Sequence, residues 1–497
     1  MFTIIIHLED INVTFFSMKF VIFLIVVFVI YYIIPSKYRY IWCLISSYLF
    51  YTSWNVKYTA VLFSITLISY FTAFMMKKWD KRICLGIGVS SSLIVLMVFK
   101  FWNFWSLGFP TLFGILDKST GGIISIVAPI GLSFFVLVAI GYMVDVYRGD
   151  VECETNIGRY ALFISFFPTV LSGPIERSSN LLQQIRAKNE FSYAKVKRGL
   201  LLILWGYFLK LLIANRLAII VNAAFENRYE QTGATMMIAV IFYGIQLYAD
   251  FAGYSFIAVG IGKLLGFDLI ENFKQPYFAK NIRDFWVRWH ISLSSWLKDY
   301  VYIPLGGNRK GKARQCINLM FTFLVSGIWH GAGWKFVIWG AIHGIYQVIA
   351  KICLPIRVKI STRIDIKRDC FSYKLLQRMI TFGLVDFAWL FFRASSTREA
   401  LSVCKNVLVN FQFLNTLTNK LYLMGYDEGR FYLLLAEIII LLLVDIVHER
   451  KISIVEWLDR QNKLFRWIIY LIVCLTLAIG IIHDYGTTAT AFIYTRF

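Results

Sequence analysis

The sequence predicts an all-α protein that crosses a membrane many times. Of its 497 residues, 58% are hydrophobic and only 16% are charged, and the mean hydropathy is +0.64. A soluble domain carries roughly 25% charged residues and rarely exposes large apolar surfaces. The apolar residues are also grouped in blocks, many of them near the length of about 20 residues that a membrane-spanning helix needs. These observations exclude an ordinary soluble fold.

Successive apolar segments are the candidate membrane helices. Because several of them are short or polar, we expect about eleven transmembrane helices plus re-entrant and interfacial ones. The expected re-entrant segment is 160–175, because FFPTVLSGP contains two prolines and a glycine that suit a broken helix. The candidate segments lie near 17–35, 39–54, 58–76, 83–105, 123–147, 160–175, 199–225, 233–262, 316–329, 334–354, 378–393, 431–447 and 464–483.

The charge of the chain predicts its orientation in the membrane. Lys and Arg number 51 against 29 Asp and Glu, which gives a formal net charge of +22. This excess indicates nucleic-acid binding in a soluble protein, but in a membrane protein it is typical of cytoplasmic loops. The basic residues gather in loops, whereas 106–122 and 484–495 are nearly uncharged. We therefore expect no nucleic-acid partner, and we place both termini outside the cytoplasm.

One integral membrane domain over 1–497 is the simplest organisation, because no long polar region separates the apolar blocks. The eight cysteines contain no CxxC pair, so neither a disulfide framework nor a zinc ribbon is indicated. No typical cleavable signal peptide is evident, since the first apolar block is long and follows Glu9 and Asp10.

The chemistry-bearing residues are concentrated in the region 271–344. It contains three of the six histidines, His290, His330 and His343, within 54 residues. His330 interrupts an apolar run and is flanked by tryptophan and glycine. An ionisable residue at membrane depth is costly and is by default a functional-site hypothesis. Neutral imidazole is suited to general-base work, although a buried structural histidine is the alternative. His343 either supports the site or pairs two helices.

The segment before His330 has an aromatic periodicity. Spacings of four and three residues predict that these side chains share one face of an interfacial helix, with that face in the headgroup boundary. His290 lies at the edge of this face, where it is either a hydrogen-bonded interfacial histidine or a site residue. The residues of the predicted face are Phe285, Trp289, Leu293, Trp296 and Tyr300.

A basic, glycine-containing loop follows at 304–314, with the sequence PLGGNRKGKAR. Its backbone N–H groups and positive charges suit a phosphate-bearing ligand, but a cytoplasmic loop has the same composition. Spacings of 40 and 13 residues between the three histidines do not suggest a local metal site, so we expect none. No GxSxG occurs, which argues against a serine hydrolase.

The same residues resemble a known family, the membrane-bound O-acyltransferases (MBOAT), and within it the AlgI- and PatA-like bacterial branch that O-acetylates polysaccharides. The resemblance covers nearly the whole chain. The motifs that carry it are PIGLSFF at 129–135, YMVDVYRG at 142–149, FFPTVLSGPIER at 166–177, YADFAGYSFIAVGIGKLLGF at 248–267, ENFKQPY at 271–277, RWHISLSSWLKDYVYIPLGGNR at 288–309, WHGAGWKFVIWGAIHG at 329–344 and LFFRA at 390–394.

The resemblance implies a funnel-shaped helical fold in a bacterial plasma membrane, with its catalytic histidine at the thin centre. On this basis His330 is the expected catalytic residue and His290 the second active-site histidine. The implied reaction moves an acyl group, expected to be acetyl, from a cytoplasmic thioester such as acetyl-CoA to a hydroxyl. The final acceptor is an extracytoplasmic polysaccharide, and the usual partner is an SGNH-fold protein on the outer side. No bound cofactor is expected.

Further residues receive expected roles around this reaction. Arg309, Lys310 and Asn308 are candidate donor-binding residues, because a basic rim attracts the phosphates of a CoA donor. His343, Trp329 and Asp299 are candidate supporting residues.

The C-terminal segment 484–497 is expected to be an extracytoplasmic tail. Its end, AFIYTRF, resembles the FIYFxF tail of DltX, the small partner of the D-alanyl transferase DltB. Tyr494 is therefore a candidate acyl relay, while an aromatic anchor at the membrane interface is the other interpretation. Thr495 departs from the motif, which has phenylalanine after its tyrosine.

Two other functions compete with this one. A D-alanyl transferase would take its donor from an acyl carrier protein, although PLGGNR and the tail on the same chain favour the acetylating branch. A transporter or flippase of a glycan or acyl precursor would predict paired broken helices in the two halves. The glycines and polar residues are instead crowded into one region.

Overall fold

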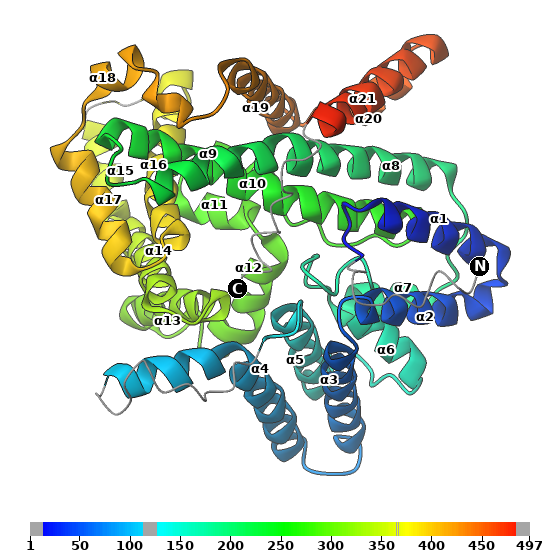
Figure 1. Cartoon of the computed structure of the whole chain (residues 1–497). Coiled ribbons are helices and arrows are strands. Elements are labelled where there is room, and N and C mark those ends of the chain that lie inside the picture. The colour runs from blue at the N-terminus through cyan, green and yellow to red at the C-terminus, as the bar shows by residue number, and fades with distance from the viewer. Residues whose placement is uncertain (1–12, 113–126, 364, 366, 484–497) are drawn as a thin grey trace. The chain divides into compact units, whose positions relative to one another are not determined.

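The computed structural model of the protein describes residues 13–112, 127–363, 365 and 367–483. Within these ranges the chain is helical, with no β-strand (Figure 1), which confirms the predicted fold class. The chain divides into two compact units. Unit 1 comprises the described parts of 1–203 and 255–271, and unit 2 those of 204–254 and 272–497.

Seven helices of the described residues are long and apolar enough to cross a membrane, or eight if a bent pair at Trp334–Ile352 and Leu354–Ile360 counts as one. Every predicted apolar segment overlaps a helix, but the predicted number of about eleven spans is not confirmed. Several segments fold as shorter helices: α1 has 16 residues, α2 has 14, α5 has 17 and α6 has only 9.

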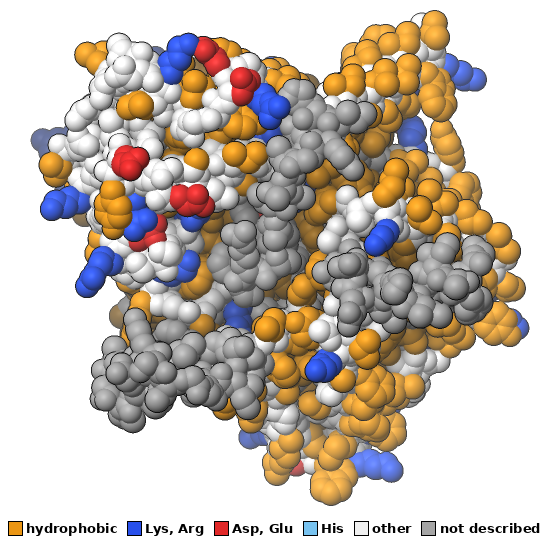
Figure 2. All heavy atoms as spheres, in the orientation of Figure 1, with side chains coloured by type: hydrophobic (Ala, Val, Ile, Leu, Met, Phe, Trp, Pro, Cys, Tyr) orange, Lys and Arg blue, Asp and Glu red, His pale blue; other side chains and the backbone are white. Residues whose placement is uncertain are grey.

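Much of the protein surface is apolar, as expected of helices that face lipid. Large hydrophobic side chains are exposed along several candidate spans, for example Ile439 at 55% and Leu471 at 59%. Figure 2 shows hydrophobic side chains over much of the face drawn, with Lys and Arg in scattered positions. In water such a surface drives association, whereas in a bilayer it is solvated by lipid chains.

Unit 1 is built from the N-terminal helices. α2 packs on α6, and α3 packs on both α4 and α5. Asparagine caps begin two of these helices, since the side chains of Asn55 and Asn156 accept the backbone N–H groups of Lys57 and Arg159. The helices are α1 (Met18–Ile33), α2 (Arg39–Thr52), α3 (Val56–Met75), α4 (Lys81–Leu112), α5 (Leu132–Arg148), α6 (Ile157–Ser165), α7 (Gln183–Arg186) and parts of α8 (Tyr193–Tyr207) and α10 (Gly233–Leu264).

A buried irregular segment follows α6. The helix ends at Ser165, and the chain continues in turns and irregular structure through 166–177, in agreement with a broken helix there. Its backbone is buried, so its polar groups need partners inside the protein. The Ser47 hydroxyl accepts the Phe167 N–H at 3.1 Å. The Glu176 carboxylate accepts the Ile270 N–H at 2.7 Å and the Asn180 side-chain amide at 2.8 Å.

Unit 2 contains the region with the three histidines. Its helices are the C-terminal end of α8, α9 (Asn215–Glu226), most of α10, α11 (Ile282–Arg288), α12 (Ile291–Leu297), α13 (Gly311–His330), α14 (Trp334–Ile352), α15 (Leu354–Arg363), α16 (Phe371–Arg393), α17 (Thr397–Val409), α18 (Phe413–Thr418), α19 (Glu428–Glu449), α20 (Ile454–Asp459) and α21 (Lys463–His483).

Helices α13 and α14 form the hairpin that carries His330 and His343. They pack side by side along their lengths (Figure 1). Glycine allows this close approach, because a Cβ added at Gly327 would overlap the Phe336 carbonyl oxygen. A Cβ at Gly340 would likewise overlap the Phe323 carbonyl oxygen. The two backbones therefore touch directly, which fixes the spacing of the hairpin.

Replacing Gly340 by Ala is expected to destabilise unit 2. The added methyl meets backbone rather than a flexible side chain, so the helices must separate, at a cost of roughly 1–3 kcal/mol. The thermal midpoint of the purified protein in detergent is expected to fall. It is measured as the loss of the monodisperse peak in size-exclusion chromatography after heating.

Gly383→Ala is the matched control, because Gly383 lies in helix α16 and a methyl group added there would meet no neighbouring segment within 4 Å. Alanine is favoured over glycine in a helix, so this variant is expected to be neutral or slightly more stable. Equal midpoints for the two variants would contradict the close-packing interpretation.

Candidate active site

His290 lies at a break between two short helices. α11 ends at Arg288 and α12 begins at Ile291, and His290 has a left-handed backbone conformation with φ 44°. Asn272 holds this break, because its carbonyl accepts the Ile291 N–H at 3.0 Å and its side-chain oxygen accepts the Ser292 N–H at 3.1 Å. A left-handed non-glycine residue costs about 1–3 kcal/mol and is concentrated at functional sites.

The break corrects the prediction of one interfacial helix with an aromatic face in the lipid headgroups. A continuous helix is prevented because Asn272 takes the amides that the next helical turn would use. The aromatic side chains are also packed inside the protein: Phe285 and Trp289 are each 1% exposed and Trp296 is 6% exposed. Trp289 stacks on Phe285, with ring centroids 5.4 Å apart. The helical spacing of these aromatic residues therefore indicates a face that is buried in the protein, not one that faces lipid.

His330 is the last residue of α13 and is only 4% exposed. Its Nδ1 lies 2.6 Å from the carbonyl oxygen of Ser326. A carbonyl oxygen only accepts hydrogen bonds, so Nδ1 carries the proton. In the neutral imidazole the lone pair is then on Nε2. Ser326 thus fixes the tautomer that a general base needs at Nε2.

His343, in α14, has the opposite tautomer. The indole Nε1–H of Trp286 donates to His343 Nδ1 at 3.3 Å, so the proton of the neutral ring lies on Nε2. The side chain is fully buried at 0% exposure. Its Nε2 has no hydrogen-bond partner among the described residues. His343 therefore joins α14 to α11 and presents an N–H donor inside the site.

Aromatic rings surround the histidines. The Trp339 ring contacts both His330, at 4.8 Å between centroids, and His343, at 4.9 Å. Trp329 also contacts two histidines, His330 at 4.9 Å and His290 at 6.1 Å. The site is therefore apolar and closely packed, which strengthens the electrostatic interactions within it.

Several polar atoms in this aromatic cluster are available to a ligand or water. The Ser326 Oγ and the Trp339 Nε1 are buried and have no partner within the described part of the chain. Buried polar groups are normally hydrogen-bonded, so each such atom calls for an explanation. Both residues contact His330 directly. A polar substrate or a bound water beside His330 would satisfy them.

The basic loop forms a compact turn. Gly306 and Gly307 have positive φ values of 104° and 54°, which glycine adopts without strain. The side-chain amide of buried Asn318 donates to the carbonyl oxygens of Leu305 and Gly307 at 3.3 and 3.0 Å. The predicted donor-binding side chains after this turn, Asn308, Arg309 and Lys310, are all exposed.

The remaining predicted residues separate into those that join the cluster and those that do not. Trp329 belongs to it through the two ring contacts given above. Asp299 is half-buried in the segment Lys298–Tyr302, beyond the end of α12, and its supporting role stays a prediction. Tyr494 and the tail 484–497 lie outside the described residues.

Sequence reasoning missed the buried ion pairs of unit 2. Lys210 and Asp250 are 2% and 1% exposed, and their charged atoms lie 2.5 Å apart. Arg216 and Glu437 form a second buried pair at 2.5 Å. The signal was visible, since these charges lie within apolar spans, where an ionisable residue indicates function or pairing. Their partners could not be read from the sequence, because they lie on different helices.

The cluster contains the groups that proton transfer needs. In the described residues, no group of three His, Cys, Asp or Glu side chains is arranged to hold a metal ion. His330 supplies an acceptor at Nε2, and His343 supplies a buried donor. This is the equipment that acyl transfer to a hydroxyl needs: a base for the nucleophile in a dry site with oriented dipoles.

The fold and this site define a polytopic membrane protein with a buried histidine centre. The chain matches the membrane-bound O-acyltransferase family over residues 43–392, and it belongs to that family. The protein is therefore an O-acyltransferase, which confirms the resemblance seen in its motifs.

Relatives within the family carry more specific names. The chain is 35% identical over 376 residues to the probable alginate O-acetylase AlgI of Pseudomonas syringae pv. tomato, covering 75% of this chain and 70% of that protein. It is 31% identical over 502 residues to the peptidoglycan O-acetyltransferase of Helicobacter pylori, covering 92% and 91%. It is 28% identical over 295 residues to the teichoic acid D-alanyltransferase of Bacillus subtilis, covering 57% and 72%.

Two variants of His290 separate its backbone role from its chemistry. Asn tolerates the left-handed conformation, so His290→Asn is expected to keep the thermal midpoint of the wild type. His290→Val is expected to lose about 1–3 kcal/mol of stability, because a β-branched residue is strained there. Both variants are expected to lose acyl transfer.

Thermal midpoints and initial rates of acyl transfer, measured on the same purified samples, give the two readouts. If the His290→Asn variant is active, the role of His290 is only to shape the turn, and its imidazole has no chemical role. An inactive His290→Asn variant with a native midpoint would support a chemical role for the imidazole.

Proposed function

We propose that this enzyme transfers an acetyl group from a cytoplasmic thioester, across the membrane, for O-acylation of an extracytoplasmic polysaccharide or cell-wall glycan. The named relatives support this proposal, since two that match this chain at 35% and 31% identity are called a probable alginate O-acetylase and a peptidoglycan O-acetyltransferase. A location in the bacterial plasma membrane, with both termini outside the cytoplasm, belongs to the same proposal.

The observation that carries the mechanism is the hydrogen bond between His330 Nδ1 and the Ser326 carbonyl oxygen. It places the imidazole lone pair on Nε2, where it can accept the proton of an attacking hydroxyl. The hydroxyl oxygen then forms a bond to the thioester carbonyl carbon, and a tetrahedral oxyanion results. When the C–S bond breaks, the leaving thiolate takes the proton from Nε2, so His330 returns to its starting state.

His290 is proposed as the second active-site histidine. It contacts the same indole as His330, that of Trp329, and it lies at the strained break that Asn272 holds. Phe251 packs edge-on against its ring, with centroids 4.6 Å apart. A strained, well-supported side chain in a dry site suits the positioning of the thioester carbonyl or of its oxyanion.

The thioester donor is proposed to be acetyl-CoA, which is a substrate and not a bound cofactor. The exposed side chains of Asn308, Arg309 and Lys310 follow the compact turn at Gly306 and Gly307. Positive charge at such a position raises the local concentration of a polyanionic donor.

The acceptor side of the reaction is proposed to involve a second protein. An SGNH-fold enzyme outside the membrane would complete transfer to the sugar hydroxyl. Tyr494 is proposed to take the acyl group on its hydroxyl from the His330 site and to pass it to that partner. The partner's nucleophile would then attack the tyrosyl ester and release the phenol.

A D-alanyl transferase that uses a carrier protein is the second candidate function. The teichoic acid D-alanyltransferases among the relatives favour it, although they match less of this chain. Mass spectrometry of surface polymers from cells with and without the gene distinguishes the two. Loss of acetyl esters supports the first proposal, and loss of alanyl esters supports the second.

His330→Ala is expected to lower acyl transfer by about 10²–10⁴-fold, because the attacking hydroxyl loses its base. The measurement is transfer of radiolabel from acetyl-CoA into polymer by spheroplasts whose membrane has been made permeable, so that acetyl-CoA reaches the cytoplasmic side.

In the same assay, the double variant Arg309→Ala, Lys310→Ala is expected to raise KM for acetyl-CoA and to leave kcat unchanged, because it affects binding only.

His448→Ala is the matched control for His330, because His448 lies in the last turn of α19 and is given no role in the proposed mechanism. Its activity is expected to equal that of the wild type. A folded His330→Ala variant with wild-type activity would remove His330 from the mechanism.

Tyr494→Phe is expected to abolish polymer acylation in cells and to lower the release of CoA from the donor, because the acyl group loses its first acceptor. The phenylalanine keeps an aromatic anchor but has no hydroxyl to carry the acyl group. Ester content of the polymer and release of free CoA are the two measurements. Normal ester content in this variant would exclude the relay.

A further inference from the structure

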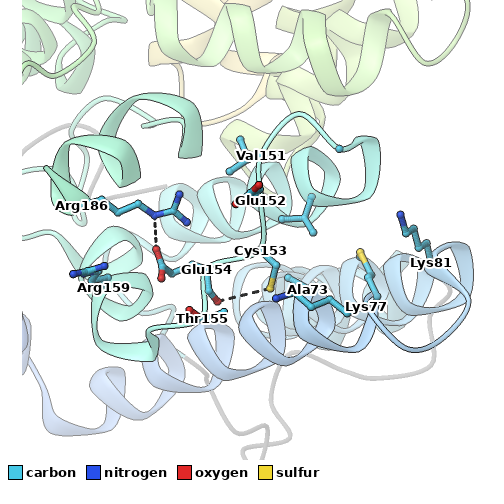
Figure 3. Close-up of a pocket in the computed structure, with 13 residues that line it drawn as sticks. Ala73, Lys77, Lys81, Val151, Glu152, Cys153, Glu154, Thr155, Arg159 and Arg186 are labelled. Carbon is cyan, nitrogen blue, oxygen red and sulfur yellow. Dashed lines mark hydrogen bonds and ion pairs between the residues drawn. The ribbon is translucent and has the colours of Figure 1, made fainter.

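Unit 1 contains a cavity of about 710 Å³ that is separate from the histidine cluster and has basic side chains around it. This is a usual size for a ligand site. Its lining residues come from the end of α3, the first residue of α4, the end of α5 and the segment after it, α6 and α7 (Figure 3). Its charged lining residues are Lys77, Lys81, Arg159, Arg186, Glu152 and Glu154.

The basic side chains around this cavity outnumber the acidic ones, so not every basic group has an acidic partner. Arg186 and Glu154 form an ion pair at 2.6 Å, as Figure 3 shows. Glu154 is fixed further, because its other carboxylate oxygen accepts the Asn156 N–H at 2.9 Å. With this pair neutralised, three basic groups remain against Glu152. The cavity therefore carries excess positive charge, which suits an anion.

The Arg159 guanidinium is held in place, but not all of its N–H donors have a hydrogen-bond acceptor. Its guanidinium lies over the Tyr40 ring, 5.4 Å from the centroid. Its Nε is buried and has no hydrogen-bond partner among the described residues. A buried guanidinium nitrogen without a partner is costly, and planar guanidinium donors match phosphate oxygens well.

The position of the cavity indicates the source of the phosphate. α3 and α4 are both candidate spans, and the cavity lies at the ends where they meet. Trp79, in the connection between them, is 68% exposed beside four basic residues. Exposed tryptophan and lysine are typical of headgroup depth. The cavity also has apolar lining residues, among them Ala73, Met76 and Val151.

We propose that this cavity binds the phosphate of an anionic phospholipid headgroup, with the acyl chains on the exposed apolar faces of α3 and α4. Basic pockets between spanning helices on the cytoplasmic side are known to take such headgroups. The loop at 77–82 is basic, so the positive-inside rule assigns this end to the cytoplasm. The proposal does not depend on the acyl-transfer reaction.

The test is native mass spectrometry of the delipidated full-length protein, titrated with phosphatidylglycerol or with phosphatidylcholine of the same acyl chains. The wild type is expected to retain one phosphatidylglycerol in preference to phosphatidylcholine. The double variant Lys77→Ala, Lys81→Ala is expected to weaken phosphatidylglycerol retention by roughly 30-fold, because each lysine near an anionic headgroup contributes several-fold.

Lys78→Ala, Arg82→Ala is the matched control, since both residues are exposed in the same segment 77–82 but do not line the cavity. It removes the same charge and is expected to change retention by less than about twofold. Equal losses in both double variants would show general attraction to the loop and overturn the site. Equal retention of the two lipids would also overturn it.

A third arm uses coenzyme A as a soluble phosphate probe. The proposal expects no coenzyme A binding that depends on Lys77 and Lys81. Binding of coenzyme A that is lost in this double variant, without lysine-dependent retention of phosphatidylglycerol, would assign the cavity to a soluble nucleotide and overturn the lipid proposal.

Discussion

Direct backbone contact between α13 and α14 is the constraint on which the histidine cluster depends. Gly327 and Gly340 allow the two helices to touch, and no larger side chain fits at either crossing point. His330 ends one helix and His343 lies within the other, so this contact sets where both rings meet Trp339. Association of helices in a membrane relies on such packing, because lipid provides no hydrophobic drive between them.

The cluster combines strain with strong local support. His290 is held in a left-handed conformation by Asn272, His330 is oriented by the Ser326 carbonyl, and His343 is oriented by an indole donor. These supports give His330 and His343 opposite tautomers in one apolar region. A proton acceptor on His330 and a proton donor on His343 are thereby presented together in the neutral rings, which is the preorganisation that the proposed acyl transfer needs.

Buried charge serves different purposes in the two units. In unit 2, ion pairs such as Lys210–Asp250 are closed and well matched, which is the arrangement expected when charges are packed within spanning helices. In unit 1, the cavity near Lys77 contains one closed pair and an excess of basic groups where α3 ends and α4 begins. The first arrangement pairs opposite charges inside the fold, whereas the second leaves basic groups that can bind an anionic ligand.

The amino-acid sequence was sufficient to predict the helical membrane class and the approximate positions of the helices, and it singled out His290, His330 and His343 as candidates, because apolar blocks and isolated polar residues are local signals. It mispredicted the helix at 285–300, since helical spacing reports a shared face but not what covers that face. The break at His290, the two tautomers and the ion-pair partners were decided only by tertiary structure. Each depends on residues such as Asn272 or Glu437, whose proximity is produced by packing between segments distant in the chain.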